Sequence, residues 1–155
     1  MALDNISLGM VVPCLVWWFR TPDLGVSSTM KDSTLLVIDP QRGFSPLCPD
    51  ELPVPTALDI VPNINTLLLM PWKLKIVTQD WHPYDHCSFD DYSGPYRRHC
   101  VENTVGAMFL PGLHVDKFNV IVRKGYHKDH DSLSAITDNP WLLTIGNKIY
   151  FTGNR

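Results

Sequence analysis

Residues 73–99 contain side chains that could bind a metal ion. They begin as a predicted strand that ends at Asp80 and continue as a polar loop holding His82, His86 and His99. Because Asp80 and His82 are two residues apart, their side chains point to the same face wherever the backbone is extended. One carboxylate and two or three neutral imidazoles suit a borderline divalent ion, Zn²⁺ first, with Fe²⁺ or Mn²⁺ as alternatives. A position left open to water or substrate would make the site catalytic, whereas a closed four-ligand shell would make it a structural zinc loop.

The bulk composition sets the class of protein. The 155 residues correspond to about one domain, and the 45% hydrophobic and 19% charged content is typical of a globular chain. A net charge of -3 gives no sign of a nucleic-acid or membrane-surface partner, so we expect a small-molecule partner. The four cysteines show neither a CxxC pair nor the density of a disulfide scaffold. They predict free thiols in a reducing compartment, the cytoplasm.

Residues 1–29 differ from the rest of the chain. Residues 8–19 are an apolar run that is too short to span a bilayer and is interrupted by Pro13. We expect residues 1–29 to be a poorly ordered extension, or a mispredicted start, that the fold does not need. The alternative is a partly buried arm that packs its tryptophans on the domain. The domain itself is predicted to cover residues 30–155.

The metal-binding loop needs strands and helices to position it. Residues 34–39 are a continuous apolar run ending in an acid, which is typical of a strand buried in a parallel sheet. Residues 57–68 predict a helix with one apolar face, capped by Thr56, with Pro62 in its first turns. Further strands are predicted at residues 74–78, 118–122 and 148–152, with a helical or irregular piece near Trp141. This order predicts an open α/β sheet.

Three predicted strands end at charged residues, namely Asp39, Asp80 and Lys124. In an open α/β sheet, ligands bind in the crevice beyond the carboxyl ends of the strands. Each of these charges alone is better explained as a solvated loop residue. Because parallel strands bring their carboxyl ends to one edge, we expect the three side chains to meet beside the metal-binding loop.

Four motifs identify a family resemblance. VIDPQRGF, VTQDWHPYDHCSF, RRHCVENTVGA and VRKGYHKDHDSLSA resemble, in order and spacing, the motifs of nicotinamidases (pyrazinamidases), which are isochorismatase-like cysteine hydrolases. The match runs over residues 35–139. It implies a three-layer αβα fold with a mainly parallel sheet. It also implies hydrolysis of nicotinamide to nicotinate and ammonia through a cysteine thioester, for NAD salvage. Separately, an unpaired strand edge after residues 148–152 predicts association of the chain, such as a homo-oligomer. Isochorismatases and carbamoylsarcosine amidases match less well, because they generally lack this metal-binding loop.

The resemblance also assigns roles to single residues. Asp39 would be the general base that takes the thiol proton, and Lys124 would steady the thiolate, because a nearby cation lowers a thiol pKa. The metal ligands would be Asp80, His82 and His99. His86 matches an extra ligand of some members, and the alternative is a loop histidine that hydrogen-bonds the backbone. Phe44 and Tyr96 match the aromatic residues that sandwich the pyridine ring.

The nucleophile of the family has no counterpart in this sequence. In nicotinamidases the reactive cysteine follows the glycine after the strand that KIYFTG resembles, and here the sequence ends at Arg155. Cys14, Cys48, Cys87 and Cys100 do not match that position. We therefore expect an isochorismatase-like domain whose C-terminal part is missing, and which binds metal but is inactive. The alternative is a non-catalytic metal- or ligand-binding short isoform or pseudoenzyme of the same fold.

Overall fold

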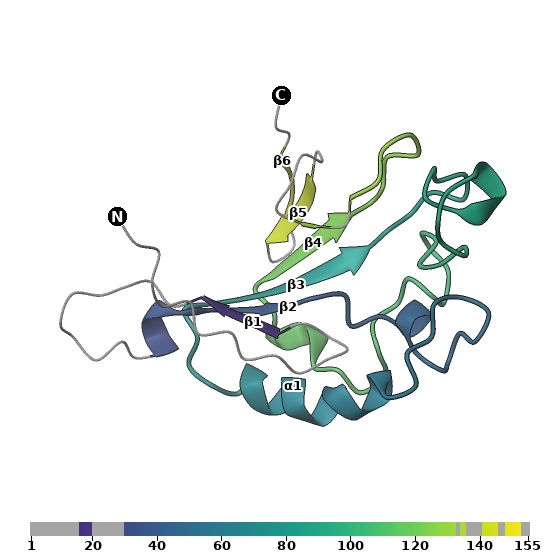
Figure 1. The fold of residues 1–155 in the computed structure, drawn as a ribbon. Coiled ribbons are helices and arrows are strands. Elements are labelled where there is room, and N and C mark those ends of the chain that lie inside the picture. Colours follow the sequence, from purple (N-terminus) through teal and green to yellow (C-terminus); the bar gives the residue numbers. More distant parts are fainter. Residues whose placement is uncertain (1–15, 20–29, 133, 136–140, 146–147, 153–155) are drawn as a thin grey trace, which may run out of the picture.

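The computed structural model describes residues 16–19, 30–132, 134–135, 141–145 and 148–152. Six strands form one sheet in chain order: β1 (Val16–Phe19), β2 (Thr34–Val37), β3 (Leu74–Asp80), β4 (Val120–Lys124), β5 (Trp141–Ile145) and β6 (Lys148–Thr152). The α-helix α1 (Val61–Leu68) lies against one face of this sheet (Figure 1). The 3-10 turns are η1 (Met30–Asp32), η2 (Arg42–Phe44), η3 (Ala57–Ile60), η4 (Asp90–Tyr92) and η5 (Val115–Lys117).

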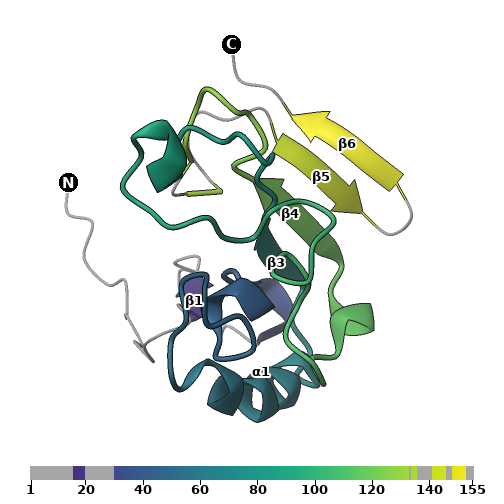
Figure 2. The same cartoon turned by 90° about the vertical axis from the view of Figure 1, so that its right-hand side faces the viewer.

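The centre of the sheet is parallel, as the sequence predicts. β2 pairs with β3, and β3 with β4, in parallel register. β1 on one side and β5 and β6 on the other are antiparallel to their neighbours. The carboxyl ends of β2, β3 and β4 therefore lie at one edge, and Figure 2 views the molecule from the loops beyond that edge. The predicted α/β sheet is confirmed, and its parallel part is what places the site.

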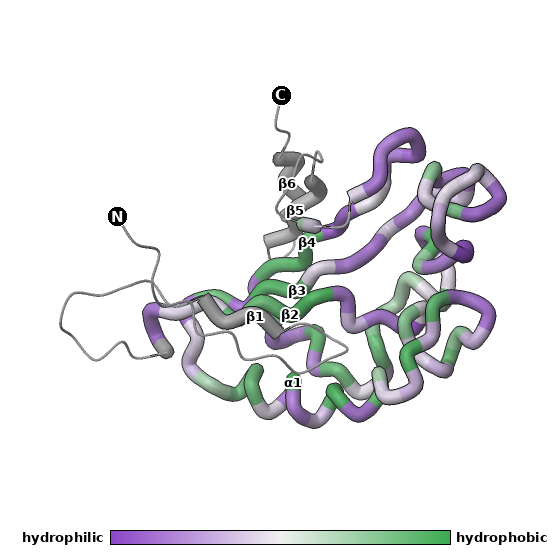
Figure 3. The backbone as a smooth tube through the Cα atoms, in the orientation of Figure 1, coloured by the Kyte–Doolittle hydropathy of each residue, from purple (hydrophilic) through white to green (hydrophobic). Residues whose placement is uncertain are grey.

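The main core lies between α1 and the parallel strands. Leu35 and Val37 of β2 and Val77 of β3 are fully buried against Ile64 and Leu68 of α1. These residues follow the period of 2 in the strands and of about 3.6 in the helix that places one apolar face on another. Strands β2, β3 and β4 are largely hydrophobic and become hydrophilic toward the loops that follow them (Figure 3). The polar chemistry is thus concentrated at the carboxyl edge.

The predicted helix cap at Thr56 is wrong. Thr56 makes no side-chain capping hydrogen bond, and residues 57–60 form the 3-10 turn η3 before α1 begins at Val61. Pro62 occupies the first turn of α1. Proline suits this position because it lacks the N–H that the first turn leaves unpaired, and its ring fixes φ near the helical value. The α-helix therefore starts next to the proline.

The segment near Trp141 is also different from the prediction. It forms strand β5 rather than a helical or irregular piece, and β6, predicted as a strand, is antiparallel to it. Only Gly146 and Asn147 separate the two strands in sequence. A Gly-Asn pair between two apolar runs is a hairpin signal, and this signal outweighs the helical interpretation.

Two other predictions about the chain concern its layers and its beginning. In the part of the chain that the structure describes, α1 is the one α-helix, so two of the three expected layers are seen. Of residues 1–29, Val16–Phe19 form β1, and the others lie outside the described residues. The expectation for this segment stays a prediction. Among the described residues, no helix is both long enough and apolar enough to cross a bilayer.

Candidate functional site

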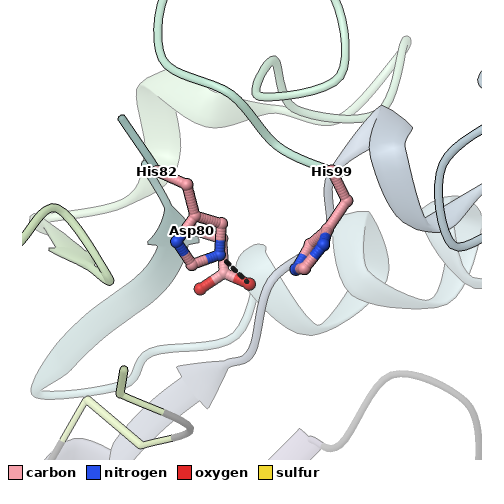
Figure 4. Close-up of side chains that lie close together, drawn as sticks. All are labelled: Asp80, His82 and His99. Carbon is pink, nitrogen blue, oxygen red and sulfur yellow. Dashed lines mark ion pairs between the residues drawn. The ribbon is translucent and has the colours of Figure 1, made fainter. Parts of the chain in front are cut away.

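A carboxylate and two imidazoles meet just beyond β3. Asp80 is the last residue of that strand, His82 follows two residues later, and His99 returns from the loop that β3 enters (Figure 4). All three side chains are buried, and one ligand atom from each lies within 4.8 Å of the others. The Nε2 atom of His82 is 3.6 Å from Oδ2 of Asp80. This geometry fits a divalent metal ion with N and O ligands.

Hydrogen bonds to the backbone orient both imidazoles. Nδ1 of His82 is 2.8 Å from the carbonyl oxygen of Gly125, and Nδ1 of His99 is 2.7 Å from that of Arg97. A carbonyl oxygen only accepts, so each Nδ1 carries the hydrogen and each Nε2 keeps its lone pair. Metal-binding histidines are typically held in this way by a backbone carbonyl or a carboxylate. The donor set is therefore prepared for a metal on the Nε2 side.

Gly125 is needed where it stands. Its φ of 68° lies in the left-handed region that favours glycine, and a Cβ there would also overlap the His82 ring, with Nδ1 only 2.6 Å away. The glycine thus lets its own carbonyl approach the imidazole. Gly125 follows Lys124 directly. The end of β4 therefore supplies both the charge of Lys124 and the carbonyl oxygen that orients His82.

Lys124 connects the metal triad to Asp39. Its Nζ lies 3.1 Å from Oδ2 of Asp39 and also donates to Oδ1 of Asp80. Thr78 donates to Oδ1 of Asp39 at 2.5 Å and accepts from the Asp39 backbone N–H at 3.0 Å. Asp39 itself has a φ of 46°, an uncommon conformation that these contacts hold. The three charged strand ends meet, as the parallel sheet requires.

Burial and charge move the pKa values of these three groups apart. Burial raises the pKa of Asp39, the Asp80 charge raises it further, and Lys124 opposes both. Burial alone would raise the pKa of Asp80, but Lys124 and His82 hold it below its ordinary value. Burial would lower the pKa of Lys124, but Asp80 and Asp39 together raise it. Asp39 is thus the carboxyl group that takes up a proton more readily.

Gln41 is a residue that the sequence analysis missed. Its side chain is fully buried and accepts from the Asp80 backbone N–H at 2.7 Å while donating to the Asp80 carbonyl at 2.8 Å. It also donates to the carbonyl of Ala107 at 3.0 Å. An uncharged amide in a loop carries no sequence signal for this role beyond its position two residues after Asp39. It fixes the backbone of a metal ligand across 39 residues of sequence.

His86 lies beside the triad but outside it. Its ring centroid is 4.3 Å from that of His82. Its Nδ1 is 2.7 Å from Oγ of Ser88, and its Nε2 is 3.2 Å from the carbonyl oxygen of His130. Both ring nitrogens are therefore engaged. Of the two interpretations from the sequence, this geometry favours the loop histidine that bonds the backbone.

Two aromatic rings flank His99. The ring centroid of Phe44 is 5.6 Å from that of His99, and the centroid of Tyr96 is 6.0 Å from it. Both residues are half-buried. Phe44 comes from the loop after β2 and Tyr96 from the loop after β3, so two distant segments supply apolar surface next to the metal triad.

The described cysteines are not placed as nucleophiles. No hydrogen bond or ion pair joins Cys48, Cys87 or Cys100 to Asp39 or Lys124. Cys100 is buried, its thiol is 3.6 Å from the carbonyl oxygen of Gly106, and burial raises its pKa. Burial also raises the thiol pKa of the other two. Each of the three is thus shifted away from the reactive thiolate. Cys14 lies outside the described residues.

The chain resembles known proteins in both sequence and structure. No protein-family model matches the chain. The chain is 36% identical over 120 residues to the nicotinamidase of Acinetobacter baylyi, covering 67% of this chain and 55% of that protein. The pyrazinamidase of Pyrococcus horikoshii, solved in complex with zinc, is 39% identical with a TM-score of 0.57, covering 66% of this chain and 56% of that one. PnC1 of L. infantum, solved in complex with nicotinate, is 34% identical with a TM-score of 0.66, covering 72% and 57%. The chain spans little more than half the length of each of these proteins.

Proposed function

We propose that the chain is a member of the nicotinamidase family of isochorismatase-like hydrolases and that its site binds nicotinamide. The chemistry that the site serves is hydrolysis of the carboxamide to nicotinate and ammonia, a step of NAD salvage. The observation that carries this proposal is the contact path from Asp39 through Lys124 to Asp80 of the metal triad. It couples a proton-accepting group to the group that would hold the substrate.

The proposed metal ion is zinc. Asp80, His82 and His99 would hold it, and their mixed N and O donors and fixed Nε2 orientation support this choice. The pyrazinamidase of Pyrococcus horikoshii, solved in complex with zinc, is a second support. When bound, the ion would supply a Lewis acid for the pyridine nitrogen and for water. Iron or manganese in its place is an outcome that metal analysis would distinguish.

Phe44 and Tyr96 would hold the pyridine ring between them. Both rings lie against His99, so a ring seated between them would present its nitrogen to the metal side. Offset stacking of two aromatic rings contributes about 0.5–1.5 kcal/mol beyond burial. The nicotinate in PnC1 of L. infantum supports a pyridine carboxylate as ligand of this fold.

Asp39 would act as the general base of the reaction. Its raised pKa suits a carboxylate that accepts a thiol proton and returns it to the leaving amine, so that ammonia departs as the sulfur bonds to the carboxamide carbon. Water would then cleave the thioester to nicotinate. Lys124 would stabilise the thiolate by its charge. Among the described residues, no hydrogen bond or ion pair joins Cys48, Cys87 or Cys100 to Asp39 or Lys124. This supports the proposal that the 155 residues bind the ligand without hydrolysing it.

The cell compartment and the oligomeric state are further parts of the proposal. Three free cysteines among the described residues support a reducing location, the cytoplasm. Among the described strands β6 pairs with β5 alone, and an unpaired strand edge supports association into a homo-oligomer.

Ammonia release from nicotinamide tests the proposed reaction. The 155-residue chain would be assayed with zinc, iron or manganese, beside any longer product of the same gene, and each with an Asp39→Ala partner. We expect release only from a longer product, and its loss on Asp39→Ala. Release by the short chain would contradict the proposal that it is inactive, and Cys87→Ser and Cys100→Ser would be the first variants to test for the nucleophile. Zinc-dependent nicotinate binding without release from any product would favour the non-catalytic alternative.

A further inference from the structure

Glu51 is a partly buried acid that takes no part in the ion pairs of the site. It lies in the loop between β2 and α1, far in sequence from the metal-binding loop. Its Oε2 accepts a hydrogen bond of 2.9 Å from the backbone N–H of Cys100. Cys100 directly follows the metal ligand His99 and has a φ of 45°, a conformation that non-glycine residues adopt only when their surroundings hold them. The carboxylate is thus the partner of a strained backbone position next to His99.

Two glycines make room for this carboxylate. The three heavy atoms nearest to a Cβ added at Gly106 are all carboxyl atoms of Glu51, and such a Cβ would overlap them. A Cβ at Gly43 would overlap Oε2 of Glu51 and lie 2.8 Å from Sγ of Cys100. The backbone N–H of Gly43 donates to the carbonyl of Gly106 at 2.9 Å. One carboxylate is therefore enclosed by the backbone of two loops at the point where they meet.

The residues next to Gly43 and Cys100 in the sequence belong to the candidate site. Gly43 precedes Phe44, and Cys100 follows His99. The ring centroids of Phe44 and His99 are 5.6 Å apart. We infer that Glu51 is a positioning residue that fixes His99 for metal binding and Phe44 beside it, through its hydrogen bond to Cys100 and its packing between Gly43 and Gly106. The inference rests on the proposed metal triad and not on amide hydrolysis.

Zinc affinity tests this role without any enzymatic activity. Glu51→Ala is expected to weaken zinc binding by about 10-fold, the low end of the 10–100-fold effects seen when support of a metal ligand is lost. Glu51→Gln should bind nearly as the wild type, because its amide oxygen can accept the same N–H. Asp50→Ala is the matched control, since it removes an equal charge from an exposed neighbour. The visible absorption of the Co²⁺ form, which reports coordination geometry, should change in Glu51→Ala only.

Gly106→Ala provides a second route to the same question if Glu51→Ala folds poorly. The added methyl group would displace the carboxylate while leaving Glu51 in the chain, so zinc affinity should again fall. In the Glu51→Ala background, the carboxyl atoms that this methyl group would displace are already absent. The effects of the two substitutions on zinc affinity should therefore not add. Equal zinc affinity in the wild type and both single variants would overturn the inference alone. Lack of zinc binding by the wild type would overturn the proposed metal site with it.

Discussion

Replacing Lys124 with methionine is expected to lower the free energy of unfolding by about 3–5 kcal/mol, the cost of breaking a buried ion pair from one side. Lys124 is 4% exposed and contacts both Asp39 and Asp80. Methionine would fill most of the space of the lysine stem but leave two carboxylates facing each other without a cation. Denaturant unfolding of the two proteins without added metal measures this loss.

The control and the pH dependence separate this charge effect from a packing effect. Lys117→Met removes a lysine that pairs with Asp116 at the surface, and it should leave the stability nearly unchanged. Burial would lower the Lys124 pKa, but Asp80 and Asp39 raise it above the ordinary 10.5. A raised lysine pKa contributes stability that is complete below the unfolded value and is lost as pH rises through the folded value. The gap between wild type and Lys124→Met should therefore begin to narrow as pH rises above 10.5, and a constant gap would contradict this explanation.

Replacing His82 with alanine is expected to weaken zinc binding by more than about 100-fold. Loss of a group that only orients a metal ligand lowers metal affinity about 10–100-fold, so loss of the ligand itself should lower it further. His82 contributes the Nε2 atom nearest to Asp80, and its Nδ1 bond to Gly125 would also be lost. Competition with a chromophoric chelator measures the affinity directly.

The stability that zinc confers gives an independent readout of the same change. A ligand that binds only the folded state at 100 times its Kd adds about 2.7 kcal/mol to the free energy of unfolding. We expect this gain in the wild type and in His114→Ala, which removes an exposed histidine outside the site, and we expect its loss in His82→Ala. Equal zinc stabilisation of His82→Ala and the wild type would show that the ion binds elsewhere.

The parallel sheet explains why part of the site could be predicted. Asp39, Asp80 and Lys124 each follow a buried apolar run, and parallel strands bring such ends together whatever the loops do. The pairing of Asp80 with His82 follows from the period of 2 in extended backbone. These rules are local or topological, so the sequence alone carries them.

Other parts depend on contacts that no local pattern records. Gln41 holds Asp80 across 39 residues, and Glu51 holds Cys100 across 49. An uncharged amide or a loop glutamate has many surface roles, so neither stands out before the fold is known. From the sequence, His86 could be either an extra metal ligand or a loop histidine that hydrogen-bonds the backbone. The position of the His130 carbonyl next to its Nε2, which decides between them, is known only from the fold. At Thr56 the composition matched a cap, but Pro62 decided where the helix begins.

Calorimetric titration of nicotinate into the 155-residue chain, with and without zinc, tests the account most directly. Asp80, His82 and His99 are proposed to hold a metal that in turn holds a pyridine ring between Phe44 and Tyr96. We predict binding in the presence of zinc, no binding after chelation, and no binding by His82→Ala at either condition. Nicotinate binding of equal affinity with and without zinc, or its absence from the zinc-loaded wild type, would contradict the claim.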